Sequence, residues 1–213
     1  MKGSGPGYLH ALLDRLAQHY AGQTFRDEAA HAKDEFIEKG GRVFDDDGEL
    51  FESRMAAFLE WFLLERPGDK LGVTPVMHAL TVKTYDAGDR RGLATLALSR
   101  RSLFDVGEVT LEQVELEDLL SGARHLVNER RGTAGFETGQ IAEARLFFDG
   151  QSMVFGKTFL VHPAEARDVV LGRIDSGLQG GESPADLMFA LSRLHLRWTR
   201  SRHLTADRAY AEE

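Results

Sequence analysis

The stretch DGQSMVFGKT at residues 149–158 has the outline of a phosphate-binding loop, in which glycine N–H groups, a lysine and a threonine hold a nucleotide and magnesium. The spacing contradicts this interpretation, because five residues separate Gly150 from Gly156 where the motif has four. The motif also runs into a helix, whereas Thr158 is followed by Phe-Leu-Val and soon by Pro163. Asp149-Gly150 between two apolar runs predicts a β-hairpin instead.

Two acidic groups have the residue types of metal ligands but not the spacing. Glu28, His31 and Glu35 fall on one helix face, and Glu-x-x-His is half of the pattern of a di-metal helical bundle. No second Glu-x-x-His occurs in the sequence, so a solvated charged face is the better interpretation. The acidic run at residues 45–47 lacks calcium-loop spacing and predicts a helix cap. We expect no metal site and no cofactor.

Basic residues gather in the last long helix that the sequence predicts. Arg193, Arg197 and Arg200 recur at i, i+4 and i+7 and project from one face, and Arg202 lies in the same acid-free stretch. In an acidic chain such a stripe can bind phosphates or an acidic partner. It can equally complement the negative end of the helix dipole and pair with the chain's own carboxylates.

Charged residues also surround the predicted turn at Ser121-Gly122: Glu115, Glu117, Asp118, Arg124, Glu129, Arg130 and Arg131. Pairing across neighbouring strands explains them without any catalysis. No Gly-x-Ser-x-Gly elbow or other local pattern marks a nucleophile, so we expect no catalytic residues. An enzyme acting on a phosphorylated small molecule, with His125 or His162 beside a strand carboxylate, is the remaining catalytic alternative.

The hydrophobic pattern divides the chain into three regions and predicts an α+β fold. Residues 1–100 have helical periodicity, residues 101–162 have the short alternating segments of a small antiparallel β-barrel-like region, and residues 163–213 hold two helices and a polar, frayed tail from Thr205. In the predicted helix that ends at Pro67, Trp61, Leu63 and Leu64 widen the apolar sector beyond one face. They predict either burial against the β region or an exposed apolar association surface.

Composition limits the class of protein. The 213 residues carry a net charge of −8 and no cysteine, which excludes disulfides and cysteine-based zinc sites and fits a reducing compartment. The first ten residues lack the apolar core of a secretory signal, and no apolar run approaches the length of a membrane span. We therefore expect a cytoplasmic protein that is not inserted in a membrane.

Two segments together carry a resemblance: FLEWFLLERP at 58–67, and VELEDLLSGARHLVNERR at 114–131 followed by GQIAEARLFFDGQSMVF. They resemble uncharacterised bacterial proteins related to the non-zinc part of proteins that end in a SEC-C zinc motif. The resemblance covers about residues 51–161 and implies a helical part joined to a β part. It implies no activity, and the SEC-C zinc site cannot be carried over because this chain lacks cysteine.

The leading functional prediction is a non-catalytic binding or adaptor protein that associates with another protein or with itself. The alternative is a nucleic-acid-binding protein that uses the β region and the basic helix, with Phe136, Phe147, Phe148 and Phe155 as base-stacking candidates. Strand alternation buries at least half of such phenylalanines.

Overall fold

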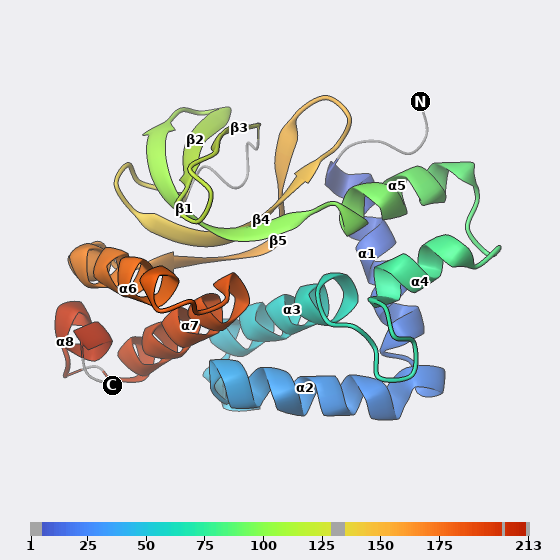
Figure 1. Ribbon diagram of the computed structural model, residues 1–213, viewed down its shortest axis with the longest axis horizontal. Helices are drawn as coiled ribbons and strands as arrows, with labels where there is room; N and C mark the ends of the chain where they lie inside the picture. The colour runs from blue at the N-terminus through green and yellow to red at the C-terminus, as the bar shows by residue number, and fades with distance from the viewer. Residues whose placement is uncertain (1–5, 129–134, 202, 212–213) are drawn as a thin grey trace. The chain divides into compact units, whose positions relative to one another are not determined.

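Figure 1 shows the computed structural model of the chain, which describes residues 6–128, 135–201 and 203–211. Five helices come first: α1 (Pro6–Tyr20), α2 (Arg26–Gly40), α3 (Glu49–Leu64), α4 (Pro75–Thr81) and α5 (Ala87–Ala97). Five strands follow: β1 (Arg100–Val109), β2 (Gln113–Asp118), β3 (Arg124–Asn128), β4 (Ile141–Phe148) and β5 (Met153–His162). Then come α6 (Arg167–Gln179), α7 (Pro184–Arg200) and α8 (Ala206–Ala211), with short 3₁₀ turns η1 (Gln23–Phe25), η2 (Asp45–Asp47) and η4 (Ala164–Ala166). The predicted α+β class is confirmed.

The chain forms two compact units, and each is assembled from separated stretches of sequence. The first unit contains the described residues of 1–37, 43–100 and 145–158, and the second those of 38–42, 101–144 and 159–213. Strands β4 and β5 therefore contribute residues to both units. Each compact unit combines residues from more than one of the three predicted regions.

Helix ends follow local chemistry. The Thr74 hydroxyl accepts the N–H of Met77 ahead of α4, and the Ser183 hydroxyl accepts the N–H of Asp186 ahead of α7. Each of these caps precedes a proline at the first helical position, as the sequence indicates. The acidic run at 45–47 forms η2 rather than the cap of α3, whose N-cap is Gly48. Every helix in the described part falls short of the length and apolarity that spanning a membrane requires.

The core of the first unit surrounds α3. Phe36 of α2 lies against Phe58 and Trp61 of α3, with ring centroids 5.7 and 5.6 Å apart. Leu63 is fully buried, and Trp61 and Leu64 keep only 5% and 8% of their surface exposed. The predicted association surface at these three residues is therefore wrong. Helix α3 contacts both α1 and α4, so its widened apolar sector is core.

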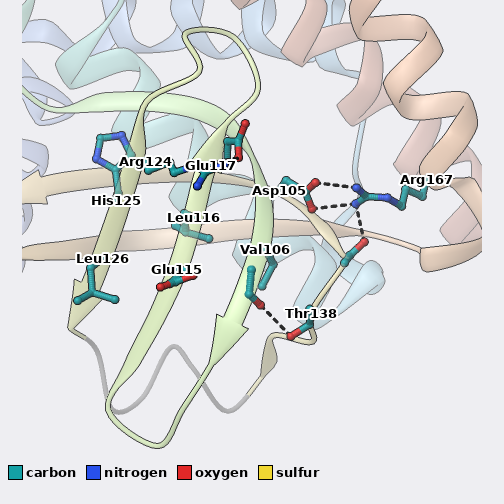
Figure 2. Close-up of a pocket in the computed structure, with 12 residues that line it drawn as sticks. Asp105, Val106, Glu115, Leu116, Glu117, Arg124, His125, Leu126, Thr138 and Arg167 are labelled. Atoms are coloured by element: carbon teal, nitrogen blue, oxygen red, sulfur yellow. Dashed lines mark hydrogen bonds and ion pairs between the residues drawn. The ribbon is translucent and has the colours of Figure 1, made fainter.

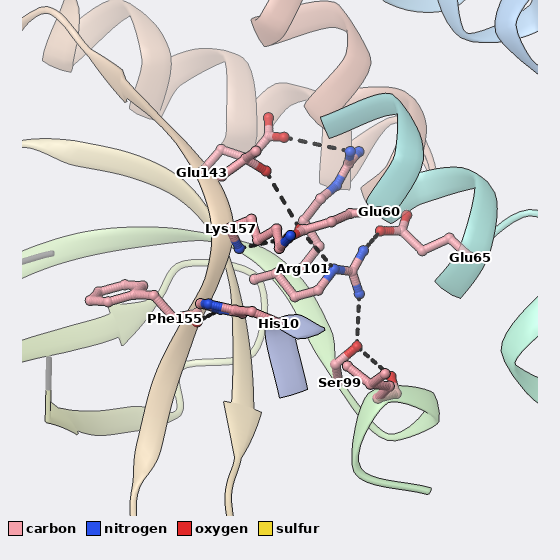
Figure 3. Close-up of polar contacts among 11 residues, drawn as sticks. His10, Glu60, Glu65, Ser99, Arg101, Glu143, Phe155 and Lys157 are labelled. Atoms are coloured by element: carbon pink, nitrogen blue, oxygen red, sulfur yellow. Dashed lines mark hydrogen bonds and ion pairs between the residues drawn. The ribbon is translucent and has the colours of Figure 1, made fainter. Parts of the chain in front are cut away.

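A buried ion pair joins α3 to the β4–β5 segment inside the first unit. Arg145 of β4 is 1% exposed, its Nε lies 3.5 Å from an oxygen of Glu60, and its guanidinium also contacts Glu65 and Ser99. Burial lowers the pKa of Arg145 to about 10. Glu60 also accepts the backbone N–H of Lys157 at 2.6 Å, as Figure 3 shows. The Gly-Lys-Thr segment thus binds a carboxylate of its own chain.

The predicted hairpin is confirmed, since β4 and β5 are neighbours on either side of Asp149-Gly150. The turn is longer than the two-residue type that the dipeptide indicates. The Asp149 carboxylate accepts the N–H groups of Gln151 and Ser152, and only Gly150 of the turn has a positive φ, +100°. The side chain of Asp149 therefore closes the turn in place of a second left-handed residue.

The core of the second unit lies between strands and the C-terminal helices, where α6, α7 and α8 contact one another (Figure 1). Leu103 of β1 and Ile141 of β4 join Val170, Leu187 and Leu191 in one cluster. The prediction of a frayed tail from Thr205 is wrong for the first part of that tail, because α8 buries Ala206, Ala209 and Tyr210 in the same cluster. Their spacing of three and one is the helical signal in that polar tail.

The five strands follow the neighbour order β1-β2-β3-β5-β4, and the order returns to its first strand as in a closed barrel. Backbone hydrogen bonds link Val106 of β1 to Gly139 and Gln140 just ahead of β4. Strands β1 and β2 are antiparallel, as are β2 and β3. This sheet presents the outer surface described below.

Replacing Arg145 with methionine should lower the free energy of unfolding by about 3–5 kcal/mol, because Glu60 would remain buried without its counter-ion. Chemical denaturation measures the change. The control is Arg124→Met, since Arg124 is 84% exposed and pairs with a half-exposed Glu117. That change should cost about 0–1 kcal/mol. Equal losses in the two variants would contradict the assignment of Arg145 to a buried ion pair.

A second expectation concerns His162, which is 1% exposed and whose Nδ1 lies 2.8 Å from the Tyr210 hydroxyl. Burial, with a smaller effect of His195, lowers the pKa of His162 to about 3. Below its unfolded pKa of 6.5, the unfolded chain binds a proton that the folded chain does not. Stability should therefore fall by about 1.4 kcal/mol per pH unit from pH 6.5 toward pH 3. Urea denaturation at several pH values across this window gives the free energy of unfolding, and its dependence on pH should be shallower by that amount in His162→Gln. Parallel pH dependences in wild type and variant would disprove the assignment.

Candidate functional site

A cleft of about 630 Å³ lies on the second unit, on the face that β1, β2 and β3 turn away from the core (Figure 2). Its lining comes from β1, β2 and the first part of β3, from the segment before β4 and from the start of α6: Asp105, Val106, Gly107, Glu115, Leu116, Glu117, Arg124, His125, Leu126, Thr138, Gly139 and Arg167. The volume is typical of small-ligand and peptide pockets.

Strand alternation puts charged residues on this outer face. Along β2, Glu115 and Glu117 are exposed, while Val114, Leu116 and Asp118 are buried. The register places Glu117 between Asp105 of β1 and Arg124 of β3, and it places Glu115 opposite Leu126. Cross-strand register thus brings Glu115, Glu117 and Arg124 of the predicted charged cluster onto one face. The prediction is wrong for Asp118, which is buried on the opposite face and accepts the hydroxyls of Ser102 and Ser121. Glu129, Arg130 and Arg131 lie outside the described residues.

One wall of the cleft is fixed by Arg167 at the start of α6. Its guanidinium donates to both oxygens of Asp105 at 2.8 and 2.6 Å and to the Gly139 carbonyl at 2.7 Å. The hydrogen bonds to Asp105 raise the pKa of Arg167 above its usual value, so the guanidinium stays charged. The Thr138 hydroxyl donates to the Gly107 carbonyl at 2.8 Å. These contacts, drawn in Figure 2, hold the segment before β4 against β1.

The histidines do not provide an acid–base pair in this cleft. His125 is the cross-strand neighbour of Leu116, so it belongs to the face opposite Glu115 and Glu117, and its ring lies against Phe104. His162 is buried against Tyr210. Among the described residues, no hydrogen bond or ion pair joins either histidine to a strand carboxylate. The charged lining and the shape of the cleft therefore suit ligand binding better than proton transfer.

The basic helix is engaged with the end of α2. Arg193 donates to the carbonyls of Glu38 and Lys39, at 3.4 and 2.6 Å, and Arg200 donates to the carbonyl of Arg42 at 2.8 Å. All these residues belong to the second unit. Carbonyls at a helix C-terminus lack intrahelical partners, so Arg193 complements the end of α2 and not that of α7. Arg200 binds the segment that follows α2. Arg197 is half-buried, and Arg202 lies outside the described residues.

Base stacking gains little support from the phenylalanines. Phe136, Phe147 and Phe155 are buried, and Phe148 alone among the four candidates is exposed, at 57%. Phe147 and Phe155 lie in runs of consecutive buried residues on β4 and β5, so both faces of these strands are covered there, and Phe136 is buried in the segment before β4. A single exposed ring does not form a continuous platform for a nucleic acid strand.

The Glu28, His31 and Glu35 face is more structured than a solvated helix face. Glu28 is 5% exposed, His31 Nδ1 lies 2.8 Å from Asp69, and Glu35 accepts from Arg66 at 2.7 Å. The interpretation of Glu28 as solvated is therefore wrong, because the segment after α3 covers this part of α2. No group of three or more His, Asp or Glu side chains within the described ranges is arranged to hold a metal ion.

Sequence reasoning missed part of the cleft, namely Asp105, Gly107, Thr138, Gly139 and Arg167. Asp105 and Arg167 are separated by 62 positions, and no local pattern joins them. Gly107 did carry a signal, because glycine inside a strand marks a bulge or a close backbone approach. Two residues of β1, Gly107 and Glu108, stand opposite the single residue Glu115 of β2, which is a β-bulge.

Comparisons with protein-family models, with curated proteins and with solved structures give no match to this chain. The class of protein therefore rests on the fold and the cleft alone: an α+β protein with a charged and partly apolar cleft on the outside of its sheet.

The wall formed by Arg167 can be tested by local stability. Arg167→Met should remove the tie to Asp105 and Gly139, so the backbone N–H of Gly139, which donates to Val106, should exchange faster with solvent. Global stability should change by only about 0–1 kcal/mol, because both partners are about one-third exposed. Amide hydrogen exchange measured by NMR reports both effects, with Arg124→Met as the control. Unchanged protection of Gly139 would show that Arg167 does not hold this wall.

Proposed function

We propose that this chain is a non-catalytic binding protein, and that it holds another polypeptide on the outer face of a small barrel at β1, β2 and β3. The observation that carries the proposal is the cleft of about 630 Å³, in which a half-exposed leucine, Leu126, lies among charged residues that are largely paired with one another. Protein interfaces combine an apolar centre with a polar rim in this way.

The surroundings of the cleft support a polypeptide ligand. Leu111, on the connection between β1 and β2, is 91% exposed, and Leu126 on β3 is 51% exposed. Large apolar side chains on the surface of one sheet are candidates for burial by a partner. A cytoplasmic location belongs to the same proposal and rests on the cysteine-free composition.

A nucleic acid fits this surface less well. Three carboxylates line the cleft, from Asp105, Glu115 and Glu117, against the two guanidinium groups of Arg124 and Arg167. Phosphates bind where lysine and arginine predominate. The arginines of α7 are partly committed to backbone carbonyls, so the basic helix supports the nucleic-acid alternative less than its sequence indicates.

The proposal can be tested by selecting displayed random peptides on the full chain and mapping the binders by NMR on ¹⁵N-labelled protein. Shifts should concentrate at residues 105–107, 115–117 and 124–126. Leu126→Asp should weaken binding by about tenfold, because about 1.4 kcal/mol of apolar contact would be lost. The matched control is Leu178→Asp on α6, where Leu178 is 38% exposed and outside the cleft lining. Absence of enriched peptides, or shifts confined to other surfaces, would overturn the proposal.

A further inference from the structure

Glu115 differs from the other charged residues of the cleft. Asp105 is paired with Arg167, and Glu117 is paired with Arg124 through contacts of 3.1 and 3.2 Å. No hydrogen bond or ion pair within the described part of the chain engages the Glu115 carboxylate. A lining of three carboxylates and two guanidinium groups therefore leaves one negative charge, and it is located at Glu115.

The β-bulge of β1 places Gly107 close to the Glu115 side chain. A Cβ atom at Gly107 would come within 3.1 Å of the Glu115 Cβ and 3.5 Å of its Oε2. A larger residue at position 107 would crowd the Glu115 Cβ, which would have to move by a few tenths of an ångström. The absence of a side chain at Gly107 thus allows Glu115 to lie close over β1, within the cleft (Figure 2).

An apolar surface stands on the other side of Glu115. Leu126 of β3 is its cross-strand partner, and such partners have Cβ atoms about 4.5–5.5 Å apart. Leu126 is 51% exposed, so part of its side chain can be covered by a ligand. A carboxylate next to an aliphatic surface matches a lysine or arginine side chain, which has an apolar stem and a cationic end.

We infer that Glu115 and Leu126 form a subsite for a lysine or arginine side chain of a bound polypeptide, with the stem on Leu126 and the cation on Glu115. The inference rests on the proposed function and adds the chemistry of the partner, which carries a basic residue in the segment that enters the cleft. Such a cation would balance the charge of the lining. The net charge of −8 would also increase the association rate of a basic partner.

A double-mutant cycle tests the subsite. Each basic residue of a selected peptide is replaced by norleucine, which keeps an apolar stem, and the affinities of both peptides are measured for wild type and Glu115→Gln by isothermal titration calorimetry. At one basic position, the norleucine replacement should lower the affinity of the peptide for wild type about fivefold, since about 1 kcal/mol corresponds to fivefold. The same replacement should leave the affinity for Glu115→Gln almost unchanged. The wild-type affinity should also fall with salt more steeply than that of Glu115→Gln.

The matched control is Glu165→Gln, because Glu165 is exposed on η4, belongs to the same unit and does not line the cleft. It removes the same charge and should leave the fivefold loss intact. If Glu165→Gln and Glu115→Gln weaken binding equally, the general charge of the protein is responsible, and the subsite is disproved.

The outcomes separate this inference from the function on which it rests. Peptides that shift the cleft resonances without any basic residue coupled to Glu115 would overturn the subsite and leave polypeptide binding standing. If no peptide binds the cleft, both fail. Spermidine added alone is the remaining probe: if it shifts the Glu115 and Leu126 resonances while no peptide is enriched, the subsite belongs to a small cation and the inference is overturned.

Discussion

In the interior of the first unit, the buried carboxylate of Glu60 pairs with two polar groups, a backbone N–H and a guanidinium. It accepts the N–H of Lys157 on β5, and it lies beside the guanidinium of Arg145 on β4. Buried polar groups are stable only when they are paired, so α3 and the two strands depend on one another. Gly156 is part of the same constraint, because a Cβ there would lie 3.0 Å from Glu60 and 3.1 Å from Arg145.

The cleft of the second unit uses ion pairs in a different setting. Asp105 and Arg167 are about one-third exposed, so their contribution to stability is small. Their two parallel hydrogen bonds nevertheless fix the orientation of the guanidinium relative to the carboxylate. The result is a wall of defined shape beside a sheet whose outer charges are already organised. This wall would lose little conformational entropy when a ligand binds, since the side chains of Asp105 and Arg167 are held before binding.

Local features of the fold could be predicted from the sequence, and features that depend on distant contacts could not. Thr74 and Ser183 were recognisable as caps, and Asp149-Gly150 as a hairpin, because each pattern acts over only a few residues. The burial of Trp61 depends on Phe36 and on the helices around α3, so the width of an apolar sector alone did not decide between core and surface. The partners of Arg193 lie about 155 positions away along the chain. For the cleft, alternation indicated Glu115 and Glu117, but the β-bulge and the Arg167 wall required the tertiary structure.

The division of the chain into two discontinuous units limits how the protein can be cut by proteases or recombined between genes. Neither compact unit is a continuous piece of polypeptide, because the chain passes between them repeatedly and splits both β4 and β5. No single cut, whether made by a protease or by a gene boundary, would release one unit complete. The two units are therefore a poor source of exchangeable modules: they must be synthesised, folded and lost together, and the cleft can be transferred to another protein only with most of the chain that surrounds it.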